Sequence, residues 1–148
     1  MGALARAAHA EGGNVVGVIP ERFQQKGIAY DAADELVVTA DLRDRKAIME
    51  QRADAFITLP GGFGTLEELL EILSLRRLRA HQKPVTLVNT GQFFDPLLAM
   101  FERLYQGGFA KPEQRSAYRV AANPTEALDW VHNHPTRRSE DQHPAEGR

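Results

Sequence analysis

A glycine-rich turn joins an apolar run to a helical pattern near the middle of the chain, "LPGGFGTLEELL" at 59–70. Its glycines, Gly61, Gly62 and Gly64, allow a sharp turn and a close approach of the backbone to a ligand. The first N–H groups of a helix lack partners within the helix, and with the helix dipole they favour a phosphate. Thr65 adds a hydroxyl donor. The turn therefore predicts either a phosphate site or a tight strand-to-helix connection without a ligand.

Glu68 lies at the start of the helix that follows this turn, beside the possible phosphate site. An acid there either compensates the helix dipole or takes part in chemistry on a bound ligand. The helix, predicted at 64–79, is apolar on two sides, so we expect a second subunit to cover its outer side. The side expected to face a sheet consists of Leu66, Leu69, Leu70 and Leu73, and the outer side of Glu68, Ile72 and Leu75.

A second group of candidate residues lies on the preceding helical pattern, 41–53, with Asp41 as its expected N-cap. Arg45 either extends along an apolar face into water or holds an anion through two hydrogen bonds. Lys46 is close by and can pair with Glu50, four residues later. The face that carries Arg45 also contains Ile48, Met49 and Arg52.

Apolar runs and helical patterns alternate along the sequence. We predict strands at 14–20, 35–40, 55–60, 83–89 and 118–122, and helices at 1–11, 41–53, 64–79, 93–106 and 123–134. Runs that are apolar throughout indicate strands buried on both faces, and alternation with helices indicates parallel pairing. The predicted fold is α/β, with a three-layer Rossmann-like parallel sheet and helices on both faces. It occupies 1–134, and the polar segment 135–148 is predicted to be disordered.

Composition excludes several classes of function. The net charge of −2 gives no footprint for nucleic acid. No apolar run approaches the roughly 18–20 residues of a membrane span. The absence of cysteine removes disulfides and thiolate metal sites and fits the cytoplasm. The five histidines show no metal-ligand spacing, and His132 and His134 are expected on the surface. We therefore expect no metal, no membrane and no nucleic acid.

These residues give the sequence a clear resemblance to the LONELY GUY (LOG) family. Its members are nucleoside 5′-monophosphate phosphoribohydrolases that release cytokinin bases, long labelled "lysine decarboxylase-like". The family hallmark PGGxGTxxE occurs here as "PGGFGTLEE", ending at Glu68, and the Arg-Lys pair of the preceding helix as Arg45–Lys46. The resemblance covers about 1–133. A decarboxylase would need pyridoxal phosphate on a lysine, and the sequence offers no support for such a site.

The resemblance implies roles for the candidate residues. Arg45 and Glu68 would be the catalytic pair, with Lys46 nearby, and Glu35 would contact the substrate. It also implies a homodimer with the active site near the interface, a nucleoside monophosphate substrate, and no cofactor. The residues that would hold the 5′-phosphate are Gly61, Gly62, Gly64 and Thr65.

The sequence departs from the family at its beginning, because the first two strands of the family pattern are absent. We therefore expect the strand at 14–20 to lack its usual neighbours and to expose a sheet edge. Leu75 stands where plant members often carry Trp, which leaves the base preference open. Two alternatives to an enzyme stay open: a non-catalytic carrier of the molybdenum-cofactor carrier type, and an inactive fragment. Glu68 with Arg45 favours the enzyme, because a carrier needs neither.

Overall fold

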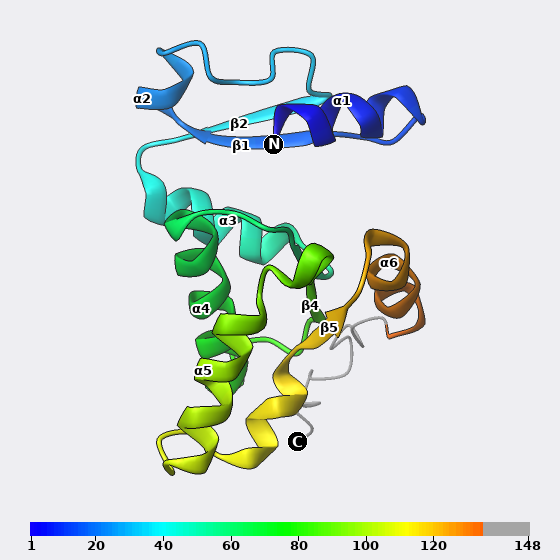
Figure 1. Cartoon of the computed structure of the whole chain (residues 1–148). Coiled ribbons are helices and arrows are strands. Elements are labelled where there is room, and N and C mark those ends of the chain that lie inside the picture. The colour runs from blue at the N-terminus through cyan, green and yellow to red at the C-terminus, as the bar shows by residue number, and fades with distance from the viewer. Residues whose placement is uncertain (135–148) are drawn as a thin grey trace, which may run out of the picture. The chain divides into compact units, whose positions relative to one another are not determined.

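The computed structural model describes residues 1–134 and divides into two compact units (Figure 1). The first unit is Met1–Ala53, and the second begins at Asp54. That 1–134 form one domain stays a prediction, and the tail predicted at 135–148 lies outside the described residues. No helix in the described part of the chain is both long enough and apolar enough to cross a membrane.

The first unit contains one pair of parallel strands, in which Val16 lies opposite Glu35 and Pro20 opposite Thr39. Because this sheet has only two strands, the other edge of β1 has no strand partner among the described residues, so the strand exposes a sheet edge as expected. Helix α3 packs on both strands and α2 also contacts them. The elements are α1 (Gly2–Ala10), β1 (Val16–Pro20), α2 (Glu21–Gln24), β2 (Glu35–Thr39) and α3 (Leu42–Arg52).

The strands of the first unit are less buried than their apolar sequences predict. Val16 is 38% exposed and Val38 is 44% exposed. Only Pro20 and Thr39, at the ends of the two strands, are buried. A two-stranded sheet offers too little area for helices to cover both faces, so burial on both faces does not hold here.

The second unit contains three parallel strands in the order β3-β4-β5. Every residue of the central strand, β4, is buried, as its apolar run predicts. Two short 3-10 helices, η1 and η2, are additional to the predicted elements. The elements are β3 (Phe56–Thr58), α4 (Phe63–Arg77), β4 (Val85–Val88), η1 (Thr90–Gln92), α5 (Asp95–Gln106), η2 (Pro112–Ala117), β5 (Arg119–Ala121) and α6 (Pro124–Asn133).

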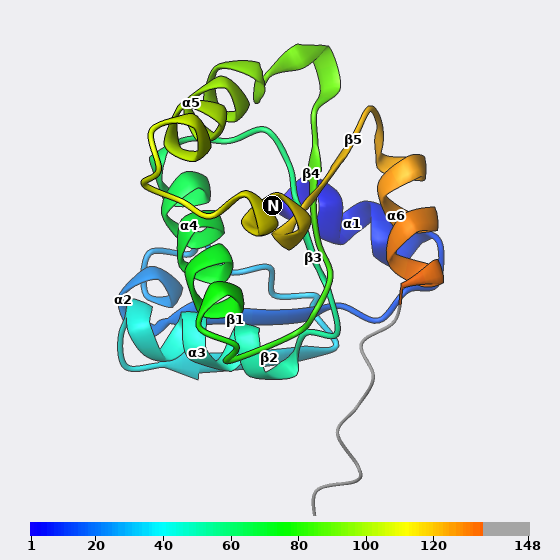
Figure 2. The same cartoon turned by 90° about the horizontal axis from the view of Figure 1, so that it is seen from below.

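Helices cover both faces of the sheet in the second unit (Figure 2). Val85 and Leu87 of β4 pack with Leu69 of α4 on one face. Val88, which points to the opposite face, packs with Ala127 of α6. The predicted α/β fold with parallel strands is therefore confirmed. The strands pair as two sheets rather than one, because alternation of strands and helices indicates direction but not which strands are neighbours.

Helix α4 turns a different stripe to the core from the one predicted. Leu69 is buried, and Leu66 and Leu73 pack against the same cluster, as expected. Ile72, expected on the outer side, also packs there, whereas Leu70 is 44% exposed. The helix is apolar on several sides, so spacing alone could not select the stripe that meets the sheet.

Candidate functional site

The glycine turn leads directly from β3 into α4. Gly62 is the N-cap of α4, with φ −88° and ψ −159°, and Leu66 N–H donates to its carbonyl oxygen at 3.2 Å. Gly62 has no side chain to cap the helix, and the first turn of α4 carries no acidic residue. The first N–H groups of α4 and the positive end of its dipole are therefore left for an anion.

The three glycines of the turn have different surroundings. A Cβ on Gly61 would lie 2.9 Å from Thr65 Cβ and still closer to its hydroxyl, so the Thr65 side chain occupies that space. At Gly62 and Gly64 a Cβ would meet nothing within 4 Å among the described residues. Gly61 is thus required for packing inside the turn. Gly62 and Gly64 instead leave the start of α4 uncovered.

Glu68 lies three residues beyond Thr65 on α4, a spacing that puts both side chains on neighbouring parts of the helix surface. Both residues are half-buried. The turn, the hydroxyl of Thr65 and the carboxylate of Glu68 are therefore grouped at one end of α4. Phe63, the first residue of the helix, is 92% exposed beside them.

Helix α3 holds the predicted arginine and lysine. Its N-cap is Asp41, as predicted, whose Oδ1 accepts hydrogen bonds from the N–H groups of Arg43 at 2.7 Å and Asp44 at 2.9 Å. These bonds hold the pKa of Asp41 below its usual value, with the bond from Asp44 the largest cause. Arg45 is half-buried and donates from Nε to the carbonyl oxygen of Val18 at 3.3 Å. Strand β1 therefore helps to orient its guanidinium group.

Glu35, the predicted substrate contact, already has an ion-pair partner. It is the first residue of β2, and both of its carboxylate oxygens accept from the guanidinium of Arg52 at 2.6 Å. The hydrogen bonds with Arg52 lower the pKa of Glu35 and raise that of Arg52. Glu35 therefore links β2 to the end of α3. Its contact with a substrate stays a prediction.

The predicted site residues are divided between the two units. Glu35, Arg45 and Lys46 belong to the first unit, and Arg45 and Lys46 are consecutive on α3. The second unit contributes the glycine turn and Glu68. Each group is assembled within its own unit, and the joining of the two groups into one site is a proposal.

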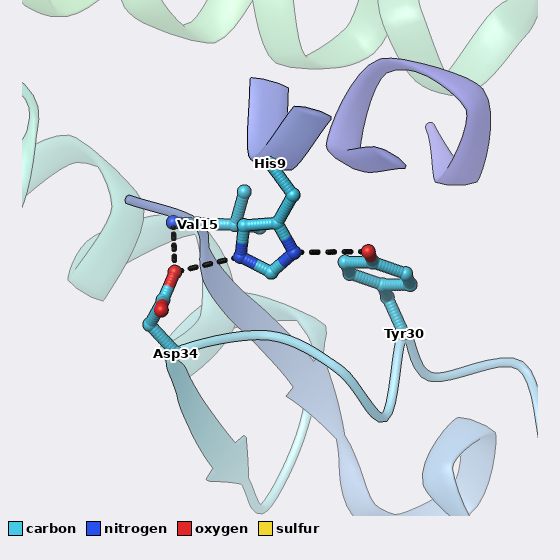
Figure 3. Close-up of polar contacts among 4 residues, drawn as sticks. All are labelled: His9, Val15, Tyr30 and Asp34. Carbon is cyan, nitrogen blue, oxygen red and sulfur yellow. Dashed lines mark hydrogen bonds and ion pairs between the residues drawn. The ribbon is translucent and has the colours of Figure 1, made fainter. Parts of the chain in front are cut away.

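A polar network in the first unit has no counterpart in the sequence analysis (Figure 3). The ring of His9 lies between Tyr30 and Asp34, with Nδ1 3.0 Å from the tyrosine hydroxyl and Nε2 2.7 Å from Asp34 Oδ2. The N–H of Val15 donates to the same oxygen at 2.6 Å. The bond from Val15, then that from His9, lowers the pKa of Asp34. The network links α1, which carries His9, to the segment before β2, which contains Tyr30 and Asp34. Asp34 also binds Val15, the residue before β1.

The other histidines that the structure describes are His81, His132 and His134. His132 and His134 are exposed, as predicted, and His134 stacks on Trp130. His81 is buried, with Nε2 3.0 Å from the carbonyl oxygen of Ile72. Among residues 1–134, no group of three or more His, Cys, Asp or Glu side chains is arranged to hold a metal ion.

Comparisons with known proteins place the chain in a family. A family model described as "possible lysine decarboxylase" matches residues 1–131. Cytokinin riboside 5′-monophosphate phosphoribohydrolase LOG5 of Arabidopsis thaliana is 41% identical over 128 residues, which are 86% of this chain and 56% of that protein. The probable enzyme LOGL5 of Oryza sativa subsp. japonica is 42% identical over 125 residues, 84% of this chain and 50% of that protein.

The chain spans about half the length of the curated relatives it matches. The family model nevertheless covers residues 1–131, a range that includes the glycine turn, Glu68 and Arg45–Lys46. On this match, and on the identity of about 40% to several phosphoribohydrolases, the chain belongs to the LOG family of "possible lysine decarboxylase" proteins.

Proposed function

We propose that this protein hydrolyses the N-glycosidic bond of a purine nucleoside 5′-monophosphate, either AMP or an N6-modified cytokinin nucleotide. The products are the free base and ribose 5-phosphate. One observation carries the proposal: the start of α4 has no side-chain cap and no acid in its first turn, and Glu68 follows within two turns. The relatives LOG5 and LOG7 of Arabidopsis thaliana are named cytokinin riboside 5′-monophosphate phosphoribohydrolases, and that activity agrees with this chemistry.

The 5′-phosphate docks against the first N–H groups of α4. The absence of side chains at Gly62 and Gly64 lets its oxygens approach the backbone, and Thr65 can donate its hydroxyl. Lys46 supplies a further positive charge. A phosphate bound here fixes the position of the ribose, although it is remote from the bond that breaks. Its binding energy therefore helps to orient C1′ of the ribose for reaction.

Glu68 and Arg45 act on the reacting end of the nucleotide. As the bond between C1′ and the base nitrogen breaks, positive charge develops on the ribose, and the carboxylate of Glu68 stabilises it and orients a water. The water oxygen bonds to C1′, and a proton goes to the base. Arg45 holds the nucleotide and the carboxylate in position through its fork of N–H donors. No metal and no cofactor enter the reaction.

We further propose that the protein is a cytoplasmic homodimer formed by a single domain. The support is the family resemblance, together with exposed apolar side chains such as Phe63 and Leu78. The predicted outer side of α4 had two apolar residues, Ile72 and Leu75. Ile72 packs against the core instead, so this side of α4 gives less support for a dimer than the sequence predicted. Size-exclusion chromatography with light scattering would report a mass of twice 16.5 kDa for the dimer.

Base release tests the function directly. Purified protein is incubated with AMP and with isopentenyladenosine monophosphate, and free base is measured by chromatography. The matched variants are Glu68→Ala and Glu67→Ala, neighbouring acids of which only Glu68 has a proposed role. We expect release by the unaltered chain and by Glu67→Ala, and none by Glu68→Ala. Binding without release would instead indicate a carrier, and neither binding nor release would indicate an inactive chain.

A further inference from the structure

A surface pocket of about 820 Å³ lies in the second unit, away from the glycine turn. Its walls come from the middle and end of α4, from α5 and from the segment that includes η2. Helix α4 contributes Leu70, Ser74 and Arg77 at helical spacing, and no residue of its first turn lines the pocket. The volume is in the range of roughly 300–1,000 Å³ typical of small-molecule sites.

The lining is strongly positive. Four cations line the pocket, Arg76, Arg77, Arg79 and Lys111, against one acid, Glu113. Within residues 1–134, no carboxylate forms an ion pair with Arg77 or Arg79. Guanidinium groups bind phosphate oxygens through paired hydrogen bonds. Several of them close together therefore suit an anion that carries several linked phosphates.

One of these arginines is bonded to the backbone, and another has an unusual backbone conformation. Arg76 is partly buried and donates from its guanidinium to the carbonyl oxygen of Lys83. Arg79 has φ of +63°, a left-handed conformation that glycine adopts more readily than a residue with a side chain. A helix that ends in this conformation ordinarily favours glycine. An arginine at this position is expected to lower the free energy of unfolding relative to glycine. Its side chain lines the pocket.

An exposed aromatic ring stands beside the cations. Phe109 lines the pocket and is 84% exposed. A Cβ on Gly107 would lie 2.9 Å from the Phe109 ring, so the ring rests against the backbone at Gly107. Tyr105 is less available, because the guanidinium of Arg115 lies over its ring at 4.3 Å. Phe101 is buried and Tyr118 is half-buried, so Phe109 is the most exposed of the rings that line the pocket and can stack on a planar group.

We propose that this pocket binds a nucleoside polyphosphate, with the phosphates on Arg76, Arg77, Arg79 and Lys111 and the base stacked on Phe109. The site is distinct from the proposed hydrolytic site, which holds a single phosphate at the other end of α4. Linked phosphates match the cluster of cations, and a base matches the exposed ring. Inorganic polyphosphate has the linked phosphates but no base to stack on Phe109.

Calorimetric titration of the full chain with ATP, tripolyphosphate and adenosine tests the proposal, and amide shifts in ¹H–¹⁵N spectra locate the binding. We expect ATP to shift the amides of Gly108, Phe109 and Lys111. Arg77→Gln combined with Arg79→Gly should weaken ATP binding at least about tenfold, whereas Arg103→Gln, an exposed arginine on α5 outside the pocket, should change it less than about twofold. Phe109→Ala should weaken ATP about fivefold and leave tripolyphosphate unchanged.

Folding is checked in the same experiment. Glycine adopts the left-handed conformation at position 79 without the strain that a side chain brings. The single variant Arg79→Gly should therefore have a melting temperature equal to or above that of the unaltered chain, and should bind ATP less tightly. ATP shifts confined to the glycine turn, or no ATP binding, would overturn the proposal. Tripolyphosphate binding as tightly as ATP, with no effect of Phe109→Ala, would overturn the assignment of a nucleoside.

Discussion

Gly61 and Thr65 fit together across the turn that starts α4: the space a Cβ of Gly61 would need is filled by the Thr65 side chain. The contact fixes the threonine rotamer and the path of the chain into the helix. The uncapped N–H groups at Gly62 and beyond therefore have a defined direction. The turn is shaped by packing within itself, and the ligand meets a surface that is already formed.

Gly61→Ala should lower the free energy of unfolding by about 1–3 kcal/mol, because the added methyl group overpacks the turn. Chemical denaturation with urea measures the change. Thr65→Ala in the same background removes the hydroxyl and methyl groups that lie near Gly61 and should recover part of the loss. An unchanged stability in Gly61→Ala would show that the threonine can move aside without cost.

Gly64→Ala should separate stability from function. No described residue lies within 4 Å of a Cβ at this position, and alanine is favoured over glycine in a helix by about 1 kcal/mol. The variant should therefore be as stable as the unaltered chain or more so. If a phosphate approaches this backbone, the methyl group obstructs it, and base release from AMP should fall at least about tenfold. Equal release with equal stability would contradict the phosphate site.

Thr86→Val should stabilise the second unit or leave its stability unchanged. Thr86 is fully buried on the central strand, and its Oγ1 has no hydrogen-bond partner among residues 1–134. Removal of a buried, unpaired hydroxyl with little change of shape removes a desolvation cost of about 1–3 kcal/mol. Thermal unfolding measures the effect, with Thr86→Ser as the variant that keeps the hydroxyl. A clear loss of stability in Thr86→Val would show that the hydroxyl has a partner.

Asp34 should make the first unit less stable in acid. Its pKa is lowered in the folded chain, chiefly by the Val15 N–H and then by His9, from a reference value of 3.8. A lowered folded pKa gives stability that is present above the unfolded pKa and is lost as pH falls through the folded pKa. Asp34→Asn should therefore lower the melting temperature at neutral pH. The difference from the unaltered chain should shrink below about pH 4.

Tyr30→Phe is the matched control for this pH dependence. It removes the contact at His9 Nδ1 and keeps both hydrogen bonds to Asp34 Oδ2. Its melting temperature should differ from that of the unaltered chain by the same amount across the acid range. A difference between Asp34→Asn and the unaltered chain that is constant with pH would show that the carboxylate charge contributes nothing.

Local signals predicted local structure well. Asp41 is predicted as a helix N-cap because its side chain can bond to N–H groups two or three residues later, and it bonds to those of Arg43 and Asp44. Asn123 caps α6 in the same way, by accepting from the N–H of Glu126. Pro124 takes the first helical position for an equally local reason, its missing N–H. The fully buried strand β4 agrees with the strand predicted at 83–89 from a short run that is apolar apart from Thr86.

Features that depend on distant residues were missed or wrongly placed. The pairing of β1 with β2 joins segments about twenty residues apart, and alternation carries no information on neighbours. Leu70 and Ile72 were exchanged between the two sides of α4, because a helix that is apolar on several sides does not identify its buried stripe. His9, Tyr30 and Asp34 form no sequence motif, so only the folded chain brings them together. The motif residues could be proposed from the sequence because each motif is contiguous along the chain, and their joint role in one site stays a prediction.

The central claim is that a nucleotide phosphate docks on the first N–H groups of α4, and amide spectra of the chain titrated with AMP and with adenosine test it most directly. We predict that AMP shifts the amide signals of Phe63, Gly64 and Thr65, and that adenosine, which lacks the phosphate, leaves them in place. Saturable AMP binding that leaves these three signals unmoved would contradict the account.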